Sequence, residues 1–188
     1  KVLERIDRII RVQTESSILI LGETGSGKKF LAQHIALGLK KKLVAANMGS
    51  IPRETAESVL FGHERGAFTG AVKDKIGRLQ VADTGTVFLD EIGEISPSLQ
   101  TKLLRFLQER EFERVGDTKT IRVDVRIIAA TNVDIEKAVR EKNFREDLFY
   151  RLAQGVFELP PLRDRGHDVE LLIEHFLREF SEQYEHRV

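Results

Sequence analysis

The sequence predicts an α/β domain in which helices flank a five-stranded parallel sheet. Short apolar runs alternate with segments of helical periodicity, as expected where crossover helices connect parallel strands. The central apolar runs are continuous, which is typical of strands covered on both faces. With 188 residues, the chain is long enough to bury the core of one such domain.

The expected elements follow one another in a regular order along the chain. The strands are expected at residues 17–21, 43–46, 86–89, 125–130 and 156–159. The clearest helices are expected at residues 27–39 and 98–110. Leu99, Leu103 and Leu107 lie on one face of the second helix, and the pair Ser96 and Pro97 supplies a start signal for it.

The chain changes character after the last expected strand. Pro160 and Pro161 interrupt it, and a charged, turn-prone connector follows at residues 163–166. Beyond the connector, apolar residues recur at helical spacing at Val169, Leu172, Ile173, Phe176, Leu177 and Phe180. This spacing predicts an amphipathic helix, which either docks on its own domain or begins a further subdomain. We therefore divide the chain into an α/β domain, residues 1–162, and a linker with a helix, residues 163–188.

Charge and composition exclude several classes of function. Lysine and arginine total 30 and are balanced by 30 acidic residues, which argues against a dedicated nucleic-acid arm. The sequence has no cysteine, so it has no disulfide framework, thiolate zinc site or cysteine nucleophile. No apolar run approaches the roughly 18 residues of a membrane span, and no signal peptide is recognisable. We expect a cytoplasmic protein without a membrane partner.

A phosphate-binding loop is predicted between the first strand and the first helix. It consists of Gly22, Glu23, Thr24, Gly25, Ser26, Gly27 and Lys28. Glycines let successive N–H groups face an anion, the helix N-terminus adds its dipole, and Lys28 can reach the β- and γ-phosphates of ATP. Lys29 completes the expected contact set, although this position usually carries the serine or threonine that holds Mg²⁺. The alternative is a glycine-rich turn without a ligand.

Polar residues at two strand ends complete the predicted site. Asp90 and Glu91 end a buried strand, where carboxylates are costly unless they have a function. Asp90 is expected to bind Mg²⁺, and Glu91 to orient and activate the attacking water; a helix cap is the alternative for Glu91. Thr131 and Asn132 end another strand, and ligands bind beyond such ends in parallel sheets. We expect them to face the same crevice, although turn initiation explains them equally well.

Three segments together resemble the AAA+ domain of bacterial enhancer-binding proteins, the NtrC-type activators of sigma-54 RNA polymerase. They are the run at residues 64–71, the strand that ends in Asp90 and Glu91, and residues 144–152. The similarity extends from about residue 17 to the C-terminus. It implies a P-loop NTPase of the AAA+ type that assembles into a homo-oligomeric ring, usually a hexamer. Such rings hydrolyse ATP to remodel closed promoter complexes of sigma-54 RNA polymerase.

The resemblance assigns the loop at residues 66–71 to gripping sigma-54. The loop consists of Gly66, Ala67, Phe68, Thr69, Gly70 and Ala71, with Phe68 and Thr69 most important. The residues alone favour a loop that can change conformation, because glycines bracket one phenylalanine within a charged frame. Without the resemblance, a buried turn and a binding loop are equally compatible with the sequence. His63, just before the loop, is expected to be a structural hydrogen-bonding residue.

The same resemblance makes Arg145 and Arg151 arginine fingers that reach the γ-phosphate bound by a neighbouring subunit. For Arg151, an ion pair with Asp147 is the alternative. Both arginines are expected on one helix, where their six-residue separation places them roughly 240° apart, so their roles differ, and Arg151 is the stronger candidate. Asn47 matches the residue that pairs with the catalytic glutamate in the family. Residues 111–122 match a second loop that supports the first.

The sequence therefore predicts the ATP-hydrolysing core of a sigma-54-dependent transcription activator. It departs from the family at Lys29, where glutamate is common, and at residues 48–50, where Met-Gly-Ser replaces Cys-Ala-Ala. Residues 163–188 are expected to hold only the first helix of the family's helical lid. Promoter or enhancer DNA would be bound through domains absent from this chain. The alternative is a nucleotide-regulated assembly module with little turnover, whereas a P-loop kinase has no use for Phe68.

Overall fold

A five-stranded parallel sheet forms the centre of the structure, a computed structural model in which residues 16–184 are described. The strands are β1 (Ile18–Leu21), β2 (Leu43–Asn47), β5 (Thr86–Asp90), β8 (Arg126–Thr131) and β9 (Gly155–Glu158). Their order across the sheet is β2-β5-β8-β1-β9, and neighbouring strands are parallel. All five predicted strands are confirmed, and each end lies within one residue of its expected position.

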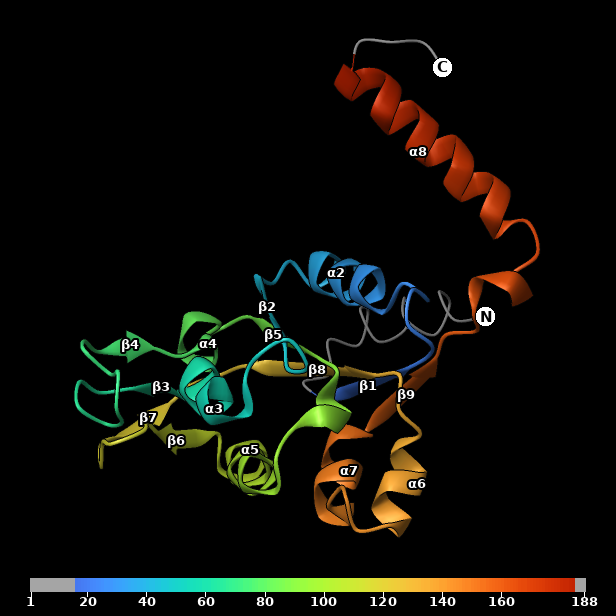
Figure 1. The fold of residues 1–188 in the computed structure, drawn as a ribbon. Coiled ribbons are helices and arrows are strands. Elements are labelled where there is room, and N and C mark those ends of the chain that lie inside the picture. The colour runs from blue at the N-terminus through green and yellow to red at the C-terminus, as the bar shows by residue number, and fades with distance from the viewer. Residues whose placement is uncertain (1–15, 185–188) are drawn as a thin grey trace.

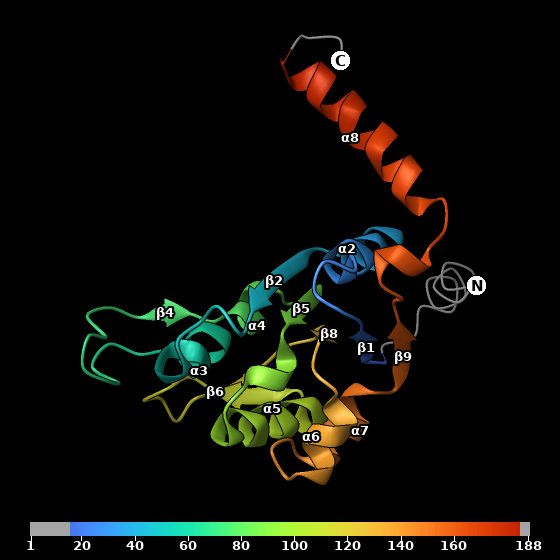
Figure 2. The same cartoon turned by 45° about the vertical axis from the view of Figure 1, so that its right-hand side comes forward.

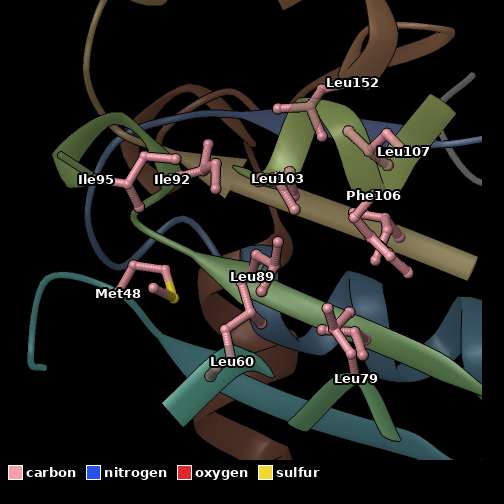
Figure 3. Packing of buried hydrophobic residues seen from close by; sticks show 14 of the residues in the cluster. Met48, Leu60, Leu79, Leu89, Ile92, Ile95, Leu103, Phe106, Leu107 and Leu152 are labelled. Carbon is pink, nitrogen blue, oxygen red and sulfur yellow. The ribbon is translucent and has the colours of Figure 1, made fainter. Parts of the chain in front are cut away.

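Helices cover both faces of the sheet (Figures 1 and 2). Successive strand residues point to opposite faces, so Leu19 belongs to the larger apolar cluster, whereas Ile18 and Ile20 belong to the smaller one. Helix α2 (Lys28–Gly38) contributes to the smaller cluster. The larger cluster draws on α3 (Arg53–Phe61), α4 (Arg78–Val81), α5 (Pro97–Glu109), α6 (Ile135–Arg140) and α7 (Glu146–Leu152). Figure 3 shows Leu103 of α5 in this cluster together with Leu89 of β5.

Helix α5 begins where the sequence predicts. The Ser96 hydroxyl accepts a hydrogen bond from the Leu99 N–H at 3.3 Å, and Pro97 is the first residue of the helix. This arrangement satisfies one of the free N–H groups at the helix start, and the proline needs no partner there. The start of α5 fixes the path of the chain that leaves the sheet after β5.

Two antiparallel hairpins extend from the domain at the end remote from α8 (Figures 1 and 2). One consists of β3 (Gly62–His63) and β4 (Lys75–Ile76), and the other of β6 (Glu111–Glu113) and β7 (Thr120–Arg122). Backbone bonds join them, because the Val115 N–H donates to the Gly62 carbonyl at 3.0 Å and the Val115 carbonyl accepts from the Glu64 N–H at 3.1 Å. The second hairpin therefore contacts the base of the loop at residues 66–71.

The last helix, α8 (Asp168–Tyr184), projects from the domain after a short turn, η2 (Leu162–Asp164) (Figures 1 and 2). The predicted amphipathic helix is confirmed, and its apolar side chains, including Leu172, Ile173 and Phe176, are exposed. Docking on its own domain, one of the two alternatives, is thus not found. That this segment begins a lid remains a prediction. Within residues 16–184, no helix has both the length and the apolar character that a membrane span requires.

A substitution at Leu103 tests whether the larger apolar cluster, to which α5 contributes, is the stabilising core. Leu103 is fully buried, so Leu103→Ala is expected to lower the free energy of unfolding by about 2–5 kcal/mol through lost burial and a cavity. Urea denaturation measures this change. The matched control is Leu37→Ala in α2, where the leucine is 77% exposed and the expected change is within about 0.5 kcal/mol. Equal losses in the two variants would contradict the assignment of the core.

Candidate functional site

The glycine-rich loop connects β1 to α2 as predicted. Gly25 and Gly27 have φ of 81° and 89°, a left-handed conformation that side chains disfavour. A Cβ atom at either position would meet open space, so backbone conformation rather than crowding requires these glycines. Gly22 is different, because a Cβ there would lie 2.8 Å from the Leu159 carbonyl oxygen. The loop is therefore seated closely against the end of β9 and open at its tip.

Lys28 is folded back onto this loop. Its Nζ donates to the carbonyl oxygens of Gly22 at 2.8 Å and Glu23 at 2.9 Å. Burial lowers the pKa of Lys28, and the negative charges of Asp90 and Glu91 oppose part of that shift. An ammonium group has three donors, so one remains for an oxygen of a bound anion.

The two carboxylates occupy the end of β5. Asp90 lies opposite Asn47 in the β2–β5 register, and its Oδ1 accepts a hydrogen bond from the Glu91 N–H at 3.0 Å. Glu91 has a left-handed φ of 55°, which is uncommon for a residue with a side chain. A Cβ on Gly49 would lie 2.0 Å from Glu91 Oε2. The glutamate thus lies against the backbone after β2, at a position where the sequence departs from the family.

The polar residues of the neighbouring strands have different environments. Asn132 Nδ2 donates to the Thr24 hydroxyl at 3.0 Å, which ties the end of β8 to the glycine-rich loop. Thr131 was expected to face the crevice, and this expectation is wrong. Its side chain is buried and its hydroxyl accepts the Val133 N–H at 3.1 Å. Its carbonyl accepts the Gly22 N–H at 3.2 Å, so Thr131 supports the loop through the backbone.

Asn47 is not paired with Glu91 in this structure. Its Oδ1 accepts a hydrogen bond from the Ser50 N–H at 3.0 Å, and its carbonyl accepts one from the Ser50 hydroxyl, also at 3.0 Å. Within the described part of the chain, Asn47 and Glu91 share no hydrogen bond. The pairing implied by the family resemblance therefore remains a prediction, and the observed role of Asn47 is to shape the turn after β2.

The groups at the strand ends converge on one cavity of about 960 Å³. Its polar side is formed by the loop, Lys28, Asp90, Glu91 and Asn132. Its apolar side is formed by Phe30, Leu31, Leu159, Leu162, Leu172 and Phe176. This size and this division between a polar and an apolar side are those of a site for a small molecule or cofactor.

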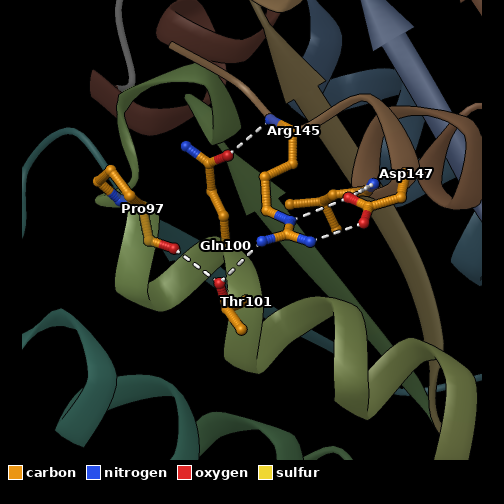
Figure 4. A network of polar contacts seen from close by, with 6 residues as sticks. Pro97, Gln100, Thr101, Arg145 and Asp147 are labelled. Carbon is orange, nitrogen blue, oxygen red and sulfur yellow. Dashed lines mark hydrogen bonds and ion pairs between the residues drawn. The ribbon is translucent and has the colours of Figure 1, made fainter. Parts of the chain in front are cut away.

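The two candidate arginine fingers differ in their surroundings. Arg145 is the N-cap residue before α7, not part of that helix, so the expected angle between two arginines on one helix is wrong. Its guanidinium donates to both carboxylate oxygens of Asp147, at 3.0 and 2.7 Å (Figure 4). These bonds lower the pKa of Asp147. An ion pair between Arg151 and Asp147 is thus also wrong; Arg151 is exposed and, among the described residues, has no ion pair.

Two arginines of the connector that were not among the predicted site residues contact the glycine-rich loop. Arg163 donates to both oxygens of the Glu23 carboxylate at 2.8 and 2.6 Å, which lowers the pKa of Glu23. Arg165 donates to the carbonyls of Pro160, at 2.8 Å, and Ser26. The charged connector was visible in the sequence, but nothing there indicated a partner 140 residues away.

The loop at residues 66–71 forms a tight surface turn. The Gly66 N–H donates to the Ala71 carbonyl at 2.8 Å. Phe68 is 37% exposed, and its ring meets the His63 ring edge-on with the centroids 5.0 Å apart. His63 Nδ1 lies 2.6 Å from the Ser58 hydroxyl, which confirms the expected structural hydrogen bond. Phe68 is therefore partly exposed to solvent and partly packed against His63.

Comparison with known proteins identifies the family of this chain. The model of the sigma-54 interaction domain matches residues 1–158. The chain belongs to the sigma-54 interaction domain family. This result confirms the resemblance to NtrC-type activators that the sequence showed.

Relatives and solved structures agree with this assignment. The domain is 50% identical over 184 residues to a Nif-specific regulatory protein of Bradyrhizobium diazoefficiens, covering 96% of the chain and 31% of the relative. It is 52% identical over 174 residues to the alginate biosynthesis regulator AlgB of Pseudomonas putida, covering 91% of the chain and 39% of AlgB. The chain thus spans between three tenths and two fifths of these relatives.

The fold matches that of NtrX from Brucella abortus solved in complex with ADP, with a TM-score of 0.89 and 36% identity over 98% of this chain and 40% of that one. A yeast Hsp104–ADP complex matches with a TM-score of 0.69 at 19% identity, covering 99% of this chain and 36% of that one, and shows the fold alone. The predicted AAA+ α/β fold is confirmed.

Proposed function

We propose that this sigma-54 interaction domain hydrolyses MgATP at the interface between neighbouring copies in a ring, expected to be a hexamer. One observation carries the proposal. The cavity combines Lys28, Asp90, Glu91 and Asn132, yet neither Arg145 nor Arg151 is among the described residues that line it. Arg165 does line it, and two of its N–H groups donate to the carbonyls of Pro160 and Ser26. We infer that an arginine of a second copy reaches the γ-phosphate, as the family resemblance implies.

The residues of the cavity fit ATP and Mg²⁺. The Ser26 hydroxyl is buried without a hydrogen-bond partner in the described part of the chain, and the loop is open above Gly25 and Gly27. Asp90 would hold Mg²⁺, whose remaining ligands would be phosphate oxygens and water; Lys29 offers no oxygen ligand. When bound, Mg²⁺ neutralises charge on the phosphates. NtrX has been solved with ATP and with ADP, which supports the same ligands here.

The chain's own groups divide the chemistry among them. Lys28 directs its free donor to the phosphates, and Asn132 holds the loop through Thr24. Glu91 lines the nucleotide cavity. In the proposed reaction its carboxylate accepts a proton from the attacking water. An arginine of the neighbouring copy stabilises the charge that develops on the transferred phosphoryl group. Thr131 and Asn47 act indirectly, through the loop and the turn after β2.

The loop at residues 66–71 is the proposed contact with sigma-54 RNA polymerase. The loop lies between β3 and β4, at the end of the domain remote from α8 (Figure 1). Phe68 is partly exposed, and the exposed Thr69 follows it. The β6–β7 hairpin adjoins the base of the loop, so movement there can be passed to Phe68. Promoter contact would require further domains. Our proposal is that ATP turnover changes the position of this loop and so remodels the polymerase complex.

Lys29 favours a second candidate function. Because it replaces the hydroxyl residue that usually holds Mg²⁺, this chain can also be interpreted as an assembly module that binds nucleotide with little turnover. A turnover assay with and without Mg²⁺ distinguishes the two functions. Sustained Mg²⁺-dependent release of phosphate supports the ATPase.

The two adjacent lysines should have unequal effects on ATP binding. Lys28→Met removes a charged donor to the phosphates and is expected to weaken binding about 10- to 100-fold. Lys29→Met is the comparison, because Lys29 also lines the cavity but is exposed, whereas Lys28 is buried against the loop; its expected loss is smaller, below about threefold. Isothermal titration with ATP measures both. Wild-type affinity in Lys28→Met would rule out the assigned role.

Mixed rings test catalysis across the interface. Glu91→Gln should still bind ATP while hydrolysis falls about 10²- to 10⁴-fold, and Arg151→Ala should lose about 10³-fold or more. Mixing the two variants is expected to restore part of the activity, because some interfaces combine an intact Glu91 with an intact Arg151. Phosphate release is measured against each variant alone. A mixture no more active than its components would show that both residues act within one copy.

Phe68 should be needed for the contact with sigma-54. Burying a phenylalanine at an interface is worth roughly 1.5–3 kcal/mol, so Phe68→Ala is expected to weaken sigma-54 binding in the presence of ATP about 10- to 100-fold. Val72→Ala, at an 80% exposed residue beside the loop, is the control and should bind within about threefold of wild type. Circular dichroism checks folding. The reverse order of effects would contradict the assignment of the loop.

A further inference from the structure

Gln100 is a polar residue in the apolar contact surface of α5. It is only 1% exposed, and its neighbours on the buried face of the helix are leucines and a phenylalanine. Burying an amide costs free energy unless its polar atoms are hydrogen-bonded. The side chain of Gln100 must therefore be explained by the groups that it joins.

The amide of Gln100 makes three hydrogen bonds. Its Nε2 donates to the carbonyl of Ile95 at 3.2 Å and to the carbonyl of Asn143 at 3.0 Å. Its Oε1 accepts the backbone N–H of Arg145 at 2.8 Å (Figure 4). Both amide hydrogens and the oxygen are thus used, so the side chain is held in one orientation.

These bonds join two parts of the proposed catalytic machinery. Ile95 follows Glu91 by four residues, at the end of the short helix η1 (Ile92–Glu94). Asn143 and Arg145 belong to the turn that precedes α7, the helix that carries Arg151. Gln100 therefore bridges the segment after the proposed catalytic glutamate and the segment of the proposed arginine fingers.

The side chain of Arg145 is held next to the same helix. Its guanidinium is bound by Asp147, and its Nη1 donates to the hydroxyl of Thr101, the neighbour of Gln100, at 3.4 Å (Figure 4). The guanidinium is still exposed to solvent. Its backbone is thus anchored in the interior while its charged group remains available at the surface.

We propose that Gln100 is a positioning residue for Arg145: it fixes the turn before α7 to the segment after Glu91, and so sets where the guanidinium meets the nucleotide of a neighbouring copy. The inference rests on the proposed function, in which Arg145 acts across the interface. A misplacement of about 1 Å in a positioned group can cost about 100-fold in rate. Gln100 acts through the backbone and touches no reacting atom.

The test uses mixed rings of two variant subunits, each of which can contribute only one half of the shared active site. Glu91→Gln subunits can supply only arginines, and Arg151→Ala subunits can supply only the pocket. Gln100→Met is added to one partner at a time. On the Glu91→Gln partner it is expected to lower phosphate release about tenfold or more; on the Arg151→Ala partner the change should stay within about twofold.

Controls separate positioning from general damage. Gln108→Met, at an exposed glutamine of the same helix, should have no effect on either partner. Gln100→Glu keeps the acceptor for the Arg145 N–H but loses the amide donors to the Ile95 and Asn143 carbonyls, so it should restore only part of the activity when it is on the Glu91→Gln partner. Thermal unfolding shows whether Gln100→Met folds. If it does not, Gln100→Glu is compared with glutamine at position 100 in the same two mixtures. Phosphate release is then expected to fall by less than about tenfold, and only when Gln100→Glu is on the Glu91→Gln partner, which supplies the arginines.

The inference would be overturned if a change at Gln100 lowered phosphate release equally on both partners, or not at all on the Glu91→Gln partner that supplies the arginines. The parent mixture without changes at Gln100 distinguishes this outcome from failure of the proposed function. If that mixture is active and Gln100 variants show no difference between the two sides, only the role of Gln100 fails. If the parent mixture itself is inactive, catalysis across the interface fails as well, and the inference falls with it.

Discussion

The register of the parallel sheet is the constraint on which the proposed site depends. Leu21 pairs with Thr131, and Asn47 with Asp90, so the carboxyl ends of four strands lie at one edge. A shift of one residue would move each side chain to the opposite face. The site is precise because two apolar clusters, one on each face, hold this register.

The packing of the two apolar clusters also maintains features of the site that are unfavourable in isolation. Lys28 is charged and buried, the Ser26 hydroxyl is buried without a partner among the described residues, and Glu91 has a left-handed backbone. Such features persist only where the surrounding structure enforces them, and they are concentrated at functional sites. In this domain all three border the same cavity. Their concentration there supports a ligand-binding role independently of the family match.

The structure also shows how separate parts of the domain are connected. Arg163 and Arg165 bind the glycine-rich loop to the connector before α8, and Gln100 binds the segment after Glu91 to the turn before α7. Backbone bonds join the β6–β7 hairpin to the base of the loop that carries Phe68. These links provide physical routes between the nucleotide cavity, the subunit surface and the loop.

The sequence by itself determined the five strands, the start of α5, the glycine-rich loop and the pair Asp90 and Glu91. These features are local, because periodicity, glycine spacing and caps depend on residues close together in the chain. Only the tertiary structure decided that Thr131 faces inward, that Asp147 binds Arg145 and not Arg151, and that Arg163 reaches Glu23. It alone revealed the bonds of Gln100. Each of these outcomes depends on which side chains meet across the folded domain or on the exact end of a helix, and neither is encoded in local periodicity.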